Sequence, residues 1–457
     1  MIKKLAAVLA IIVGITNIGG IFAPESAYAA AAPEIIAEAG ILIDGTTGQI
    51  LYTKNENATL EPASTTKMIT CLLAIENLEM DHVVTIDDET PFTEGSRIYL
   101  LEDEQITVEN LLYALMLESA NDAAVALAKE ISGSTEAFAV KMNERAKELG
   151  ATSTNFVNPN GLHTEGHLST VHDLAMIAKG CMENETFRTL CSTYYHYIPA
   201  TNKQDERHMY NTNRLLYDEK TLVPVNGVSV PAKYEGAVGI KTGYTSHAGG
   251  CLVAGAERDG TFLIAVVMKS TDAGRFGDSI ALFDYGFASY HTVKAADITD
   301  DMGRASVKRG AVADVGLELA ESAYVTLPIE ASSSVLSTKL VLEDERTAPI
   351  KKGDELGRLE IYEGESNLLT TVSVLAKEEV GEGTLLSVFG IENHTAYIIY
   401  IVAGVIVTLM LALTIAYIVL KRRQIRRRRE RRAKRAMEIA KQRLEREKDI
   451  TKRDWRF

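Results

Sequence analysis

The sequence predicts an α/β layered domain followed by a small all-β domain, with a hydrophobic segment near each end of the chain. Strand patterns stand at both ends of residues 32–290, and apolar residues recur at helical spacing between them. Helix signals fade over residues 292–389, where short β-type stretches such as 335–342 and 370–375 take over. A length of 457 residues fits two folded domains plus targeting segments.

The N-terminus has the order of residues found in a secretory signal peptide. Two lysines precede an apolar run over residues 5–22, and Ala27-Tyr28-Ala29 supplies the small residues of a cleavage site. We therefore predict that residues 1–29 are a signal peptide, with an uncleaved anchor as the alternative. In either case the body that follows leaves the cytoplasm.

Residues 32–290 are expected to form one domain of strand–helix–strand order with a large helical insert. The expected strands are a hairpin over residues 41–52 and two strands, 251–256 and 261–268, joined by the turn Asp259-Gly260. The expected helices are 108–117 with Thr107 as N-cap, 122–131, and one through Lys179 that opens with a capping box of Thr170 and Asp173.

A second membrane signal lies near the C-terminus, where residues 396–420 carry no charge. Such a helix of 25 residues reaches about 37 Å, enough to cross a bilayer with some tilt. The tail, residues 421–457, has 18 Lys/Arg against 6 Asp/Glu, a net of +12. Because positive residues stay on the cytoplasmic side, we expect a cytoplasmic tail and an extracytoplasmic body. A buried core helix is the alternative.

Charge and cysteine usage narrow the function classes. The chain has a net charge of −14, so outside the basic tail it carries −26, which is too acidic for a nucleic-acid binder. Cys71, Cys181, Cys191 and Cys251 show no C-x-x-C and no zinc spacing. We expect four buried free thiols, with a Cys181–Cys191 bridge as the alternative.

Three histidines lie close together in the sequence and are candidate metal ligands: His163, His167 and His172. We expect them to be ordinary surface histidines. The sequence therefore predicts neither a metal nor a cofactor.

The pattern S-x-x-K from Ser64 to Lys67 occurs once in the chain. It follows Pro62 and opens an apolar run over residues 68–75, which predicts the first turn of a helix. Residues three apart share a helix face, so the amine of Lys67 can reach the hydroxyl of Ser64. A serine needs a base, and a lysine serves as one only when burial or a cationic neighbour lowers its pKa.

Ser119-Ala120-Asn121 stands at the turn between two predicted helices, where a short polar turn can point into a cleft. Helix capping is the alternative reading of such residues. A second S-x-N begins at Ser153, which shows how common the pattern is.

Lys241-Thr242-Gly243 ends an apolar approach to a strand and is the only K-T-G in the chain. An edge strand can pair with a peptide backbone, and a cation with a hydroxyl can meet a carboxylate. Gly243 would let the ligand approach closely. A plain turn is the alternative.

Together and in this order, the three motifs resemble those of the low-molecular-mass penicillin-binding proteins that are D-alanyl-D-alanine carboxypeptidases. The resemblance covers residues 34–389. It implies a β-lactamase/transpeptidase-like fold, with an antiparallel sheet flanked by helices and a helical subdomain. The matching segments are PASTTKM at 62–68, ESANDA at 118–123, NPNGL at 158–162 and VGIKTGYT at 238–245.

The resemblance implies chemical roles at matched positions. Ser64 would be acylated by the penultimate D-alanine of a peptidoglycan stem peptide, with Lys67 as the base. Ser119 and Asn121 would relay a proton and hold the substrate amide. Water would then hydrolyse the acyl-enzyme, and a β-lactam such as penicillin would acylate the same serine.

The resemblance also implies binding roles. Lys241 and Thr242 would hold the terminal carboxylate, and the backbone N–H groups of Ser64 and Tyr244 would form the oxyanion hole. Arg275 resembles the second carboxylate contact of the family, although the spacing before it is about one residue short.

Three alternatives stay open at this level. A β-lactamase would use the same motifs, but the chain lacks the E-x-x-L-N loop of those enzymes. An endopeptidase or transpeptidase could use the same residues, and only analysis of the products separates these activities. A non-catalytic wall scaffold or sensor would rely on the β domain and the basic tail.

Overall fold

The computed structural model describes residues 31–343 and 346–453, so the predicted signal peptide lies outside the described residues. The chain divides into two compact units, which are described separately. The first holds the described residues up to Ala296 together with Ser322–Thr338 and Ile361–Thr370. The second holds Asp297–Glu321, Lys339–Glu360 and the residues from Thr371 onward.

The first unit is built on a five-stranded antiparallel sheet of order β2-β1-β11-β10-β9. Both predicted hairpins are confirmed, and the turn between β10 and β11 is Asp259-Gly260. The order places β9, which carries the K-T-G motif, at an edge of the sheet. The strands are β1 (Ala39–Asp44), β2 (Ile50–Lys54), β9 (Ala237–Thr245), β10 (Gly249–Arg258) and β11 (Thr261–Ser270).

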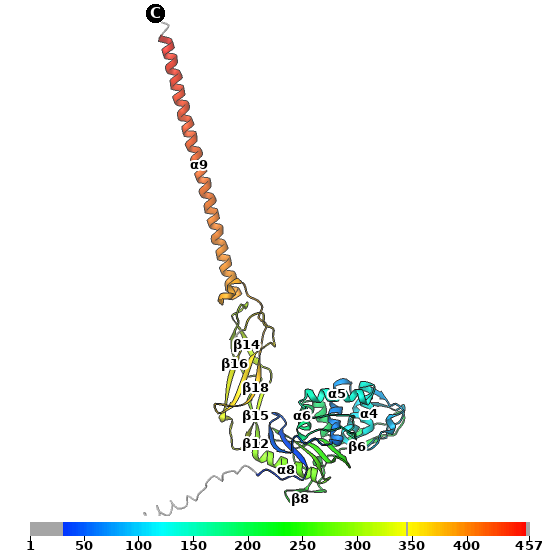
Figure 1. Cartoon of the computed structure of the whole chain (residues 1–457). Coiled ribbons are helices and arrows are strands. Elements are labelled where there is room, and N and C mark those ends of the chain that lie inside the picture. The colour runs from blue at the N-terminus through cyan, green and yellow to red at the C-terminus, as the bar shows by residue number, and fades with distance from the viewer. Residues whose placement is uncertain (1–30, 344–345, 454–457) are drawn as a thin grey trace, which may run out of the picture. The chain divides into compact units, whose positions relative to one another are not determined.

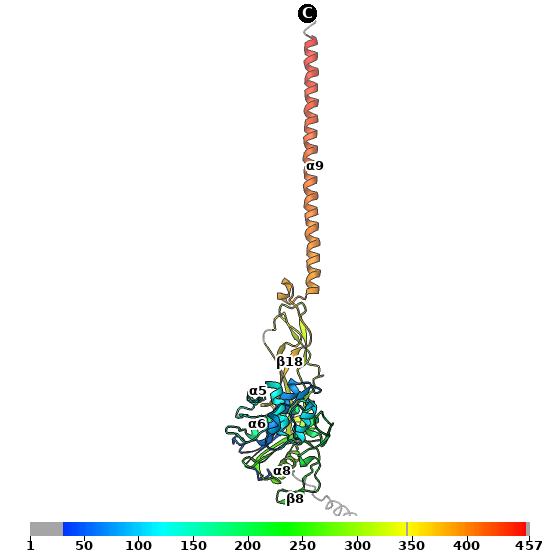
Figure 2. The ribbon, with the colours of Figure 1, turned by 90° about the vertical axis from the view of Figure 1, so that its right-hand side faces the viewer.

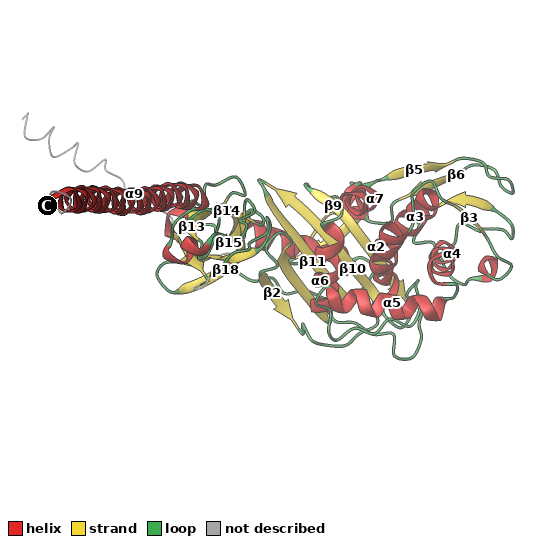
Figure 3. Ribbon diagram, turned by 90° about the horizontal axis from the view of Figure 1, so that it is seen from above, coloured by secondary structure: helices red, strands yellow, loops and turns green. Residues whose placement is uncertain are grey.

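The sheet separates two hydrophobic cores. Successive side chains of a strand point to opposite faces, so Leu42 packs in one core while Ile41 and Ile43 pack in the other. Helix α8 (Gly274–Ser289) covers the Leu42 face. Helices α2 (Lys67–Asn77) and α6 (Val171–Met182) lie against the opposite face (Figure 3).

The helical insert contains the two helices expected there, α3 (Val108–Leu117) and α4 (Asn121–Ser132). Thr107 caps α3 as predicted. Thr170 caps α6, but the predicted capping box is wrong in its second half. The carboxylate of Asp173 accepts instead from the backbone of Ser153 and the hydroxyl of Thr154, so it ties α6 to the preceding loop.

The remaining short elements complete the first unit around this framework. They are helices α5 (Thr135–Glu148) and α7 (Glu185–Ser192), the 3₁₀ turns η1 (Ala63–Thr66), η2 (Thr90–Phe92) and η3 (Arg214–Leu216), and the hairpins β3–β4 (Val83–Thr85, Gln105–Thr107), β5–β6 (Tyr195–Ile198, Arg207–Tyr210) and β7–β8 (Leu222–Val225, Val228–Pro231). In the same unit, β12 (Tyr290–Ala296) pairs with β15 (Ala323–Pro328).

Beyond β12 the described residues form strands and short 3₁₀ turns up to the final helix, as the sequence predicts. A five-stranded sheet has the order β13-β14-β18-β17-β16. Its strands are β13 (Arg304–Ser306), β14 (Asp314–Leu319), β16 (Leu336–Leu342), β17 (Glu355–Glu363) and β18 (Asn367–Ala376), and the turns are η4 (Ser333–Val335) and η5 (Leu385–Phe389).

The chain ends in one long helix, α9 (Asn393–Arg453), which is continuous in both side views (Figures 1 and 2). Its most apolar stretch of 18 residues has a mean hydropathy of 2.7, so by length and composition it could cross a membrane. The basic residues after position 420 continue the same helix.

All four cysteines are buried and free, as expected, and burial raises the pKa of each thiol. The Cys181–Cys191 bridge left open by the sequence is not formed.

Candidate active site

Ser64 lies in the 3₁₀ turn η1, immediately before the α-helix that Lys67 opens. The predicted helix start after Pro62 is therefore confirmed, although its first turn is a 3₁₀ turn and the α-helix begins at Lys67. Residues three apart eclipse one another in a 3₁₀ helix, so the change preserves the pairing. The Nζ atom of Lys67 lies 2.9 Å from the Oγ atom of Ser64.

The Lys67 side chain is fully buried and surrounded by oxygen atoms. Its Nζ lies 2.6 Å from Oδ1 of Asn121 and 2.6 Å from the carbonyl oxygen of Asn160, in addition to Ser64. An ammonium group has three N–H donors, and this cradle offers one acceptor to each.

Electrostatics favour the neutral form of this amine. Burial, and then the positive charge of Lys241, lower the pKa of Lys67 well below its usual value. Burial, and then Arg275, lower the pKa of Lys241 to about 7. Three basic groups thus share one buried region, which suits an anionic ligand and disfavours a full set of charges without one.

The helix-to-helix corner holds Ser119 and Asn121 as the sequence predicts. Ser119 adopts a left-handed φ of 58°, and its side chain is nearly buried. The amide of Asn121 is oriented from both ends, because Oδ1 faces Lys67 while Nδ2 donates to the carbonyl of Glu94 at 2.7 Å. Asp122 accepts from the backbone of the same 94–100 loop, so the corner and that loop form one rigid piece.

The edge strand β9 brings Lys241, Thr242 and Tyr244 to the same region. Lys241 is buried, Thr242 is nearly so, and the Tyr244 ring is exposed. Arg275, near the start of α8, donates from Nη1 to the carbonyl of Gly243 at 2.7 Å. Although the sequence before Arg275 is about one residue shorter than in the family, the Arg275 side chain still contacts the strand that carries K-T-G.

Gly243 also lies close to the turn that carries Ser64. A Cβ at this position would lie 3.1 Å from the backbone nitrogen of Ser64 and 3.1 Å from the carbonyl of Pro62. The missing side chain lets the edge strand approach the turn that carries Ser64. This contact brings the backbone of β9 beside the backbone nitrogen of Ser64.

Two residues of the site were not singled out from the sequence. Asn160 supplies a carbonyl to Lys67, and Thr212 Oγ1 lies 2.7 Å from Thr242 Oγ1. The NPNGL segment was noted only as a matching flank, and nothing near Thr212 in the sequence signals its contact with β9.

The expectation of surface histidines is wrong for His167, which is 2% exposed. The N–H of Val157 donates to its Nδ1, so the neutral ring carries its proton on Nε2 and donates it to Thr66 Oγ1, 2.9 Å away. Burial, and then Lys67, lower the pKa of His167 to about 4. His163, by contrast, is exposed as expected.

Two family models match this chain. Residues 26–272 match peptidase S11, described as D-alanyl-D-alanine carboxypeptidase. Residues 290–382 match the C-terminal domain of penicillin-binding protein 5.

Individual proteins show the same likeness. D-alanyl-D-alanine carboxypeptidase DacF of Bacillus subtilis strain 168 is 34% identical over 350 residues, which cover 75% of this chain and 86% of the relative. The crystal structure of penicillin-binding protein 5 from Haemophilus influenzae matches with a TM-score of 0.62 at 28% identity, over 77% of this chain and 99% of that one. A mutant of the Streptomyces K15 DD-transpeptidase matches with a TM-score of 0.51 at 33% identity, over 56% of this chain and 99% of that one.

Proposed function

The chain belongs to the peptidase S11 family of D-alanyl-D-alanine carboxypeptidases, which are serine hydrolases of the penicillin-binding protein fold, and from this premise we propose that Ser64 is its nucleophile and Lys67 the general base. The substrate is the D-Ala-D-Ala terminus of peptidoglycan, and β-lactams are the corresponding inhibitors.

The observation that carries the proposal is the set of oxygen atoms around Lys67. A neutral amine keeps two N–H donors and one lone pair. The carbonyl oxygens of Asn121 and Asn160 can only accept, so they take the two N–H groups. The lone pair is then left for the one partner that can donate, the hydroxyl of Ser64. The cradle thereby sets the direction of proton transfer from serine to lysine.

Acylation follows from this arrangement. Ser64 Oγ bonds to the carbonyl carbon of the penultimate D-alanine while its proton passes to Lys67. The resulting oxyanion is stabilised by the backbone N–H groups of Ser64 and Tyr244. When the C–N bond breaks, the leaving D-alanine amine takes the proton from Lys67, with Ser119 as the relay. Water repeats the sequence on the acyl-enzyme and releases the shortened peptide.

Lys241, Thr242 and Arg275 hold the terminal carboxylate of the substrate. Burial, and then the nearby charge of Arg275, lower the pKa of Lys241 to about 7. A bound carboxylate attracts the ammonium group and so favours the charged lysine. The carboxylate of a β-lactam meets the same groups, which explains why one site accepts both ligands.

Mass spectrometry of the full chain after exposure to penicillin tests the nucleophile. We expect one acyl group on the peptide that contains Ser64, and D-alanine release from a stem-pentapeptide analogue. Ser64→Ala should lose both while keeping its thermal unfolding temperature. Labelling of another residue in the wild type, or undiminished D-alanine release by the variant, would overturn the assignment.

Transpeptidation is a second candidate, because one of the matching structures is a DD-transpeptidase. Adding a glycine or D-amino-acid acceptor during turnover separates the two fates of the acyl-enzyme. Free shortened peptide identifies hydrolysis, and an acceptor adduct identifies transfer. Rapid multiple turnover of penicillin without D-alanine release would instead indicate a β-lactamase.

We further propose that the apolar part of α9, residues 396–420, anchors the enzyme with its body outside the cytoplasmic membrane and residues 421–457 inside. The apolar composition of α9 and the basic residues that follow support this orientation. Cysteines introduced singly in the tail should resist an impermeant thiol reagent in intact cells, whereas cysteines introduced at exposed body positions should react. Removal of the protein by carbonate washing, or labelling of the tail, would contradict the proposal.

A further inference from the structure

The solvent face of the β5–β6 hairpin is made entirely of aromatic rings. The register pairs Tyr195 with Tyr210 and Tyr197 with His208 on one face, and these four side chains are all exposed. A hairpin with one face in water normally alternates apolar residues inside with polar residues outside. In this hairpin, both residue pairs on the solvent face are aromatic, and neither contains a Ser, Thr, Asn, Gln, Asp, Glu, Lys or Arg side chain.

The rings continue beyond the hairpin as one connected series, here called the tyrosine ladder. Centroids are 4.7 Å apart from Tyr217 to Tyr194, 5.9 Å from Tyr194 to Tyr210, and 5.2 Å from Tyr210 to Tyr195. The His208 ring links Tyr195 to the last member, Tyr197, with its centroid 5.9 Å from that of Tyr195 and 5.6 Å from that of Tyr197. The tyrosines are between 37% and 48% exposed, so each ring offers roughly half of its surface to solvent.

The inner face of the hairpin already accounts for its folding. His196 stacks on Tyr113 of α3 with centroids 3.7 Å apart, and it hydrogen-bonds Asn110. Ile198 and Met209 are buried beside it. A hairpin held on this side does not need its outer rings for attachment, although cross-strand ring pairs add some stability.

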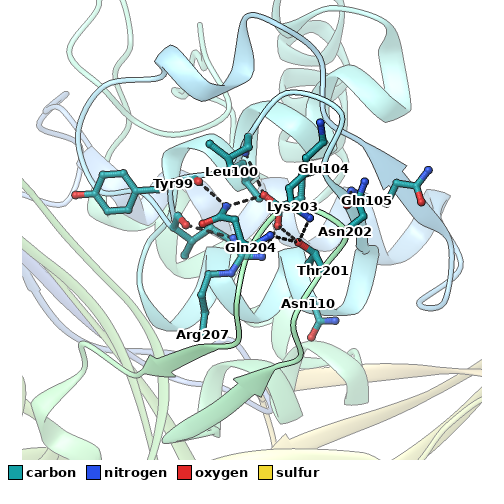
Figure 4. Close-up of polar contacts among 12 residues, drawn as sticks. Tyr99, Leu100, Glu104, Gln105, Asn110, Thr201, Asn202, Lys203, Gln204 and Arg207 are labelled. Atoms are coloured by element: carbon teal, nitrogen blue, oxygen red, sulfur yellow. Dashed lines mark hydrogen bonds and ion pairs between the residues drawn. The ribbon is translucent and has the colours of Figure 1, made fainter.

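The far end of the hairpin is fixed by a buried carboxylate. Figure 4 shows Glu104 receiving hydrogen bonds from Arg207, Thr201 and Gln204. Arg207 also donates to the carbonyl of Ile98, so the hairpin loop is bound to the same loop that orients the Asn121 corner. The ladder is therefore a rigid platform, and a rigid platform loses little entropy on binding.

The near end of the ladder reaches the catalytic motifs. The backbone N–H of Tyr210 donates to Glu118, the residue before Ser119. Two residues further along, Thr212 touches Thr242 of the K-T-G strand. The platform thus begins where the substrate peptide would be held and extends away from it over α3.

We propose that the tyrosine ladder binds the glycan strand of peptidoglycan, the polysaccharide to which the substrate stem peptide is attached. A pyranose ring has an apolar C–H face that stacks on an aromatic ring, and its rim of hydroxyls can meet phenol groups at the ring edges. A series of half-exposed rings suits an extended polymer better than a compact ligand. This inference rests on the proposed function, because it is the covalent link to the stem peptide that places glycan near this surface.

Binding is tested first without catalysis, using full-length Ser64→Ala protein in detergent and glycan strands freed of stem peptides by an amidase. We expect co-sedimentation that weakens about tenfold in the added double substitution Tyr195→Ser and Tyr197→Ser, since two stacking rings are lost. Replacing both by phenylalanine should keep most of the affinity. The matched control is Tyr324→Ser, an exposed tyrosine on β15 that lies outside the ladder.

Activity supplies the second readout. The ratio of kcat/KM on polymeric peptidoglycan to kcat/KM on a short D-Ala-D-Ala peptide should fall about tenfold in the double serine variant and stay constant in the control. Equal glycan binding by the Ser64→Ala protein with and without the Tyr195→Ser and Tyr197→Ser changes would overturn the proposal. An unchanged ratio of the two kcat/KM values would overturn it as well. If the double variant unfolds, the single Tyr197→Ser change at the distal end is measured in the same way. If the wild-type protein releases no D-alanine, the proposed function is refuted, but the glycan-binding result can still be interpreted.

Discussion

Comparing the Asn121→Asp and Asn121→Ala substitutions tests whether Lys67 acts as the proposed base or has only a structural role. Asn121 is buried, and its Oδ1 atom lies 2.6 Å from the Lys67 amine. Aspartate keeps the shape and places a negative charge against the amine. Alanine removes the acceptor, and both substitutions leave the carbonyl of Glu94 without the Nδ2 donor of Asn121.

The two substitutions act on the acylation rate by different amounts. At about 4 Å and an effective dielectric constant of about 20, the added charge favours the ammonium form by about 4 kcal/mol. The fraction of free amine at neutral pH, and with it the acylation rate, should fall on the order of 10²- to 10³-fold. Alanine leaves one buried N–H of the amine without an acceptor, which costs about 1–3 kcal/mol, or about 5- to 150-fold in rate.

The pH dependence distinguishes them further. Because aspartate raises the pKa of Lys67, its acylation rate should climb with pH over a range where the wild-type rate is already level. Alanine does not add a charge, so its deficit should not be recovered at high pH. Stopped-flow acylation by a fluorescent penicillin measures both profiles. A profile for Asn121→Asp that parallels the wild type would refute Lys67 as the base.

Three further predictions concern residues around the nucleophile. Gly243→Ala should slow penicillin acylation at least about tenfold with little change in unfolding temperature, because its β-carbon would meet the Ser64 nitrogen at 3.1 Å. Gly161→Ala should lower the free energy of unfolding by about 3 kcal/mol or more in chemical denaturation, since Gly161 has a φ of +81° and a β-carbon would lie 1.9 Å from the Ala63 carbonyl. Folding lowers the pKa of His167 from 6.5 to about 4. Between these two pH values the unfolded chain binds a proton on His167 that the folded chain does not bind. The free energy of unfolding should therefore drop by about 3 kcal/mol as the pH falls from 6.5 to about 4. Denaturation of His167→Gln should lack this loss, and an equal loss in the variant would assign it to other groups.

The sequence by itself determined the identity of the motifs and most of the local structure. The hairpins, the two helices around Ser119 and the Thr107 cap depend on turn residues, apolar spacing and capping chemistry, which act within a few residues. The pairing of Ser64 with Lys67 also follows from local spacing, and it survives the change from an α-helical to a 3₁₀ turn because residues three apart still meet.

The tertiary structure alone decided which groups surround Ser64 and Lys67. The carbonyl of Asn160 reaches Lys67 across 93 residues, and the Thr212–Thr242 contact joins segments 30 residues apart. Gly243 is needed for its approach to the backbone of Ser64, and no local pattern around a glycine reports such a distant neighbour. Burial and nearby positive charge, which lower the pKa of Lys67, arise only when strands and helices remote in sequence pack together. The sequence therefore determined which two residues pair, Ser64 and Lys67, and the packing around them decided which groups contact the amine.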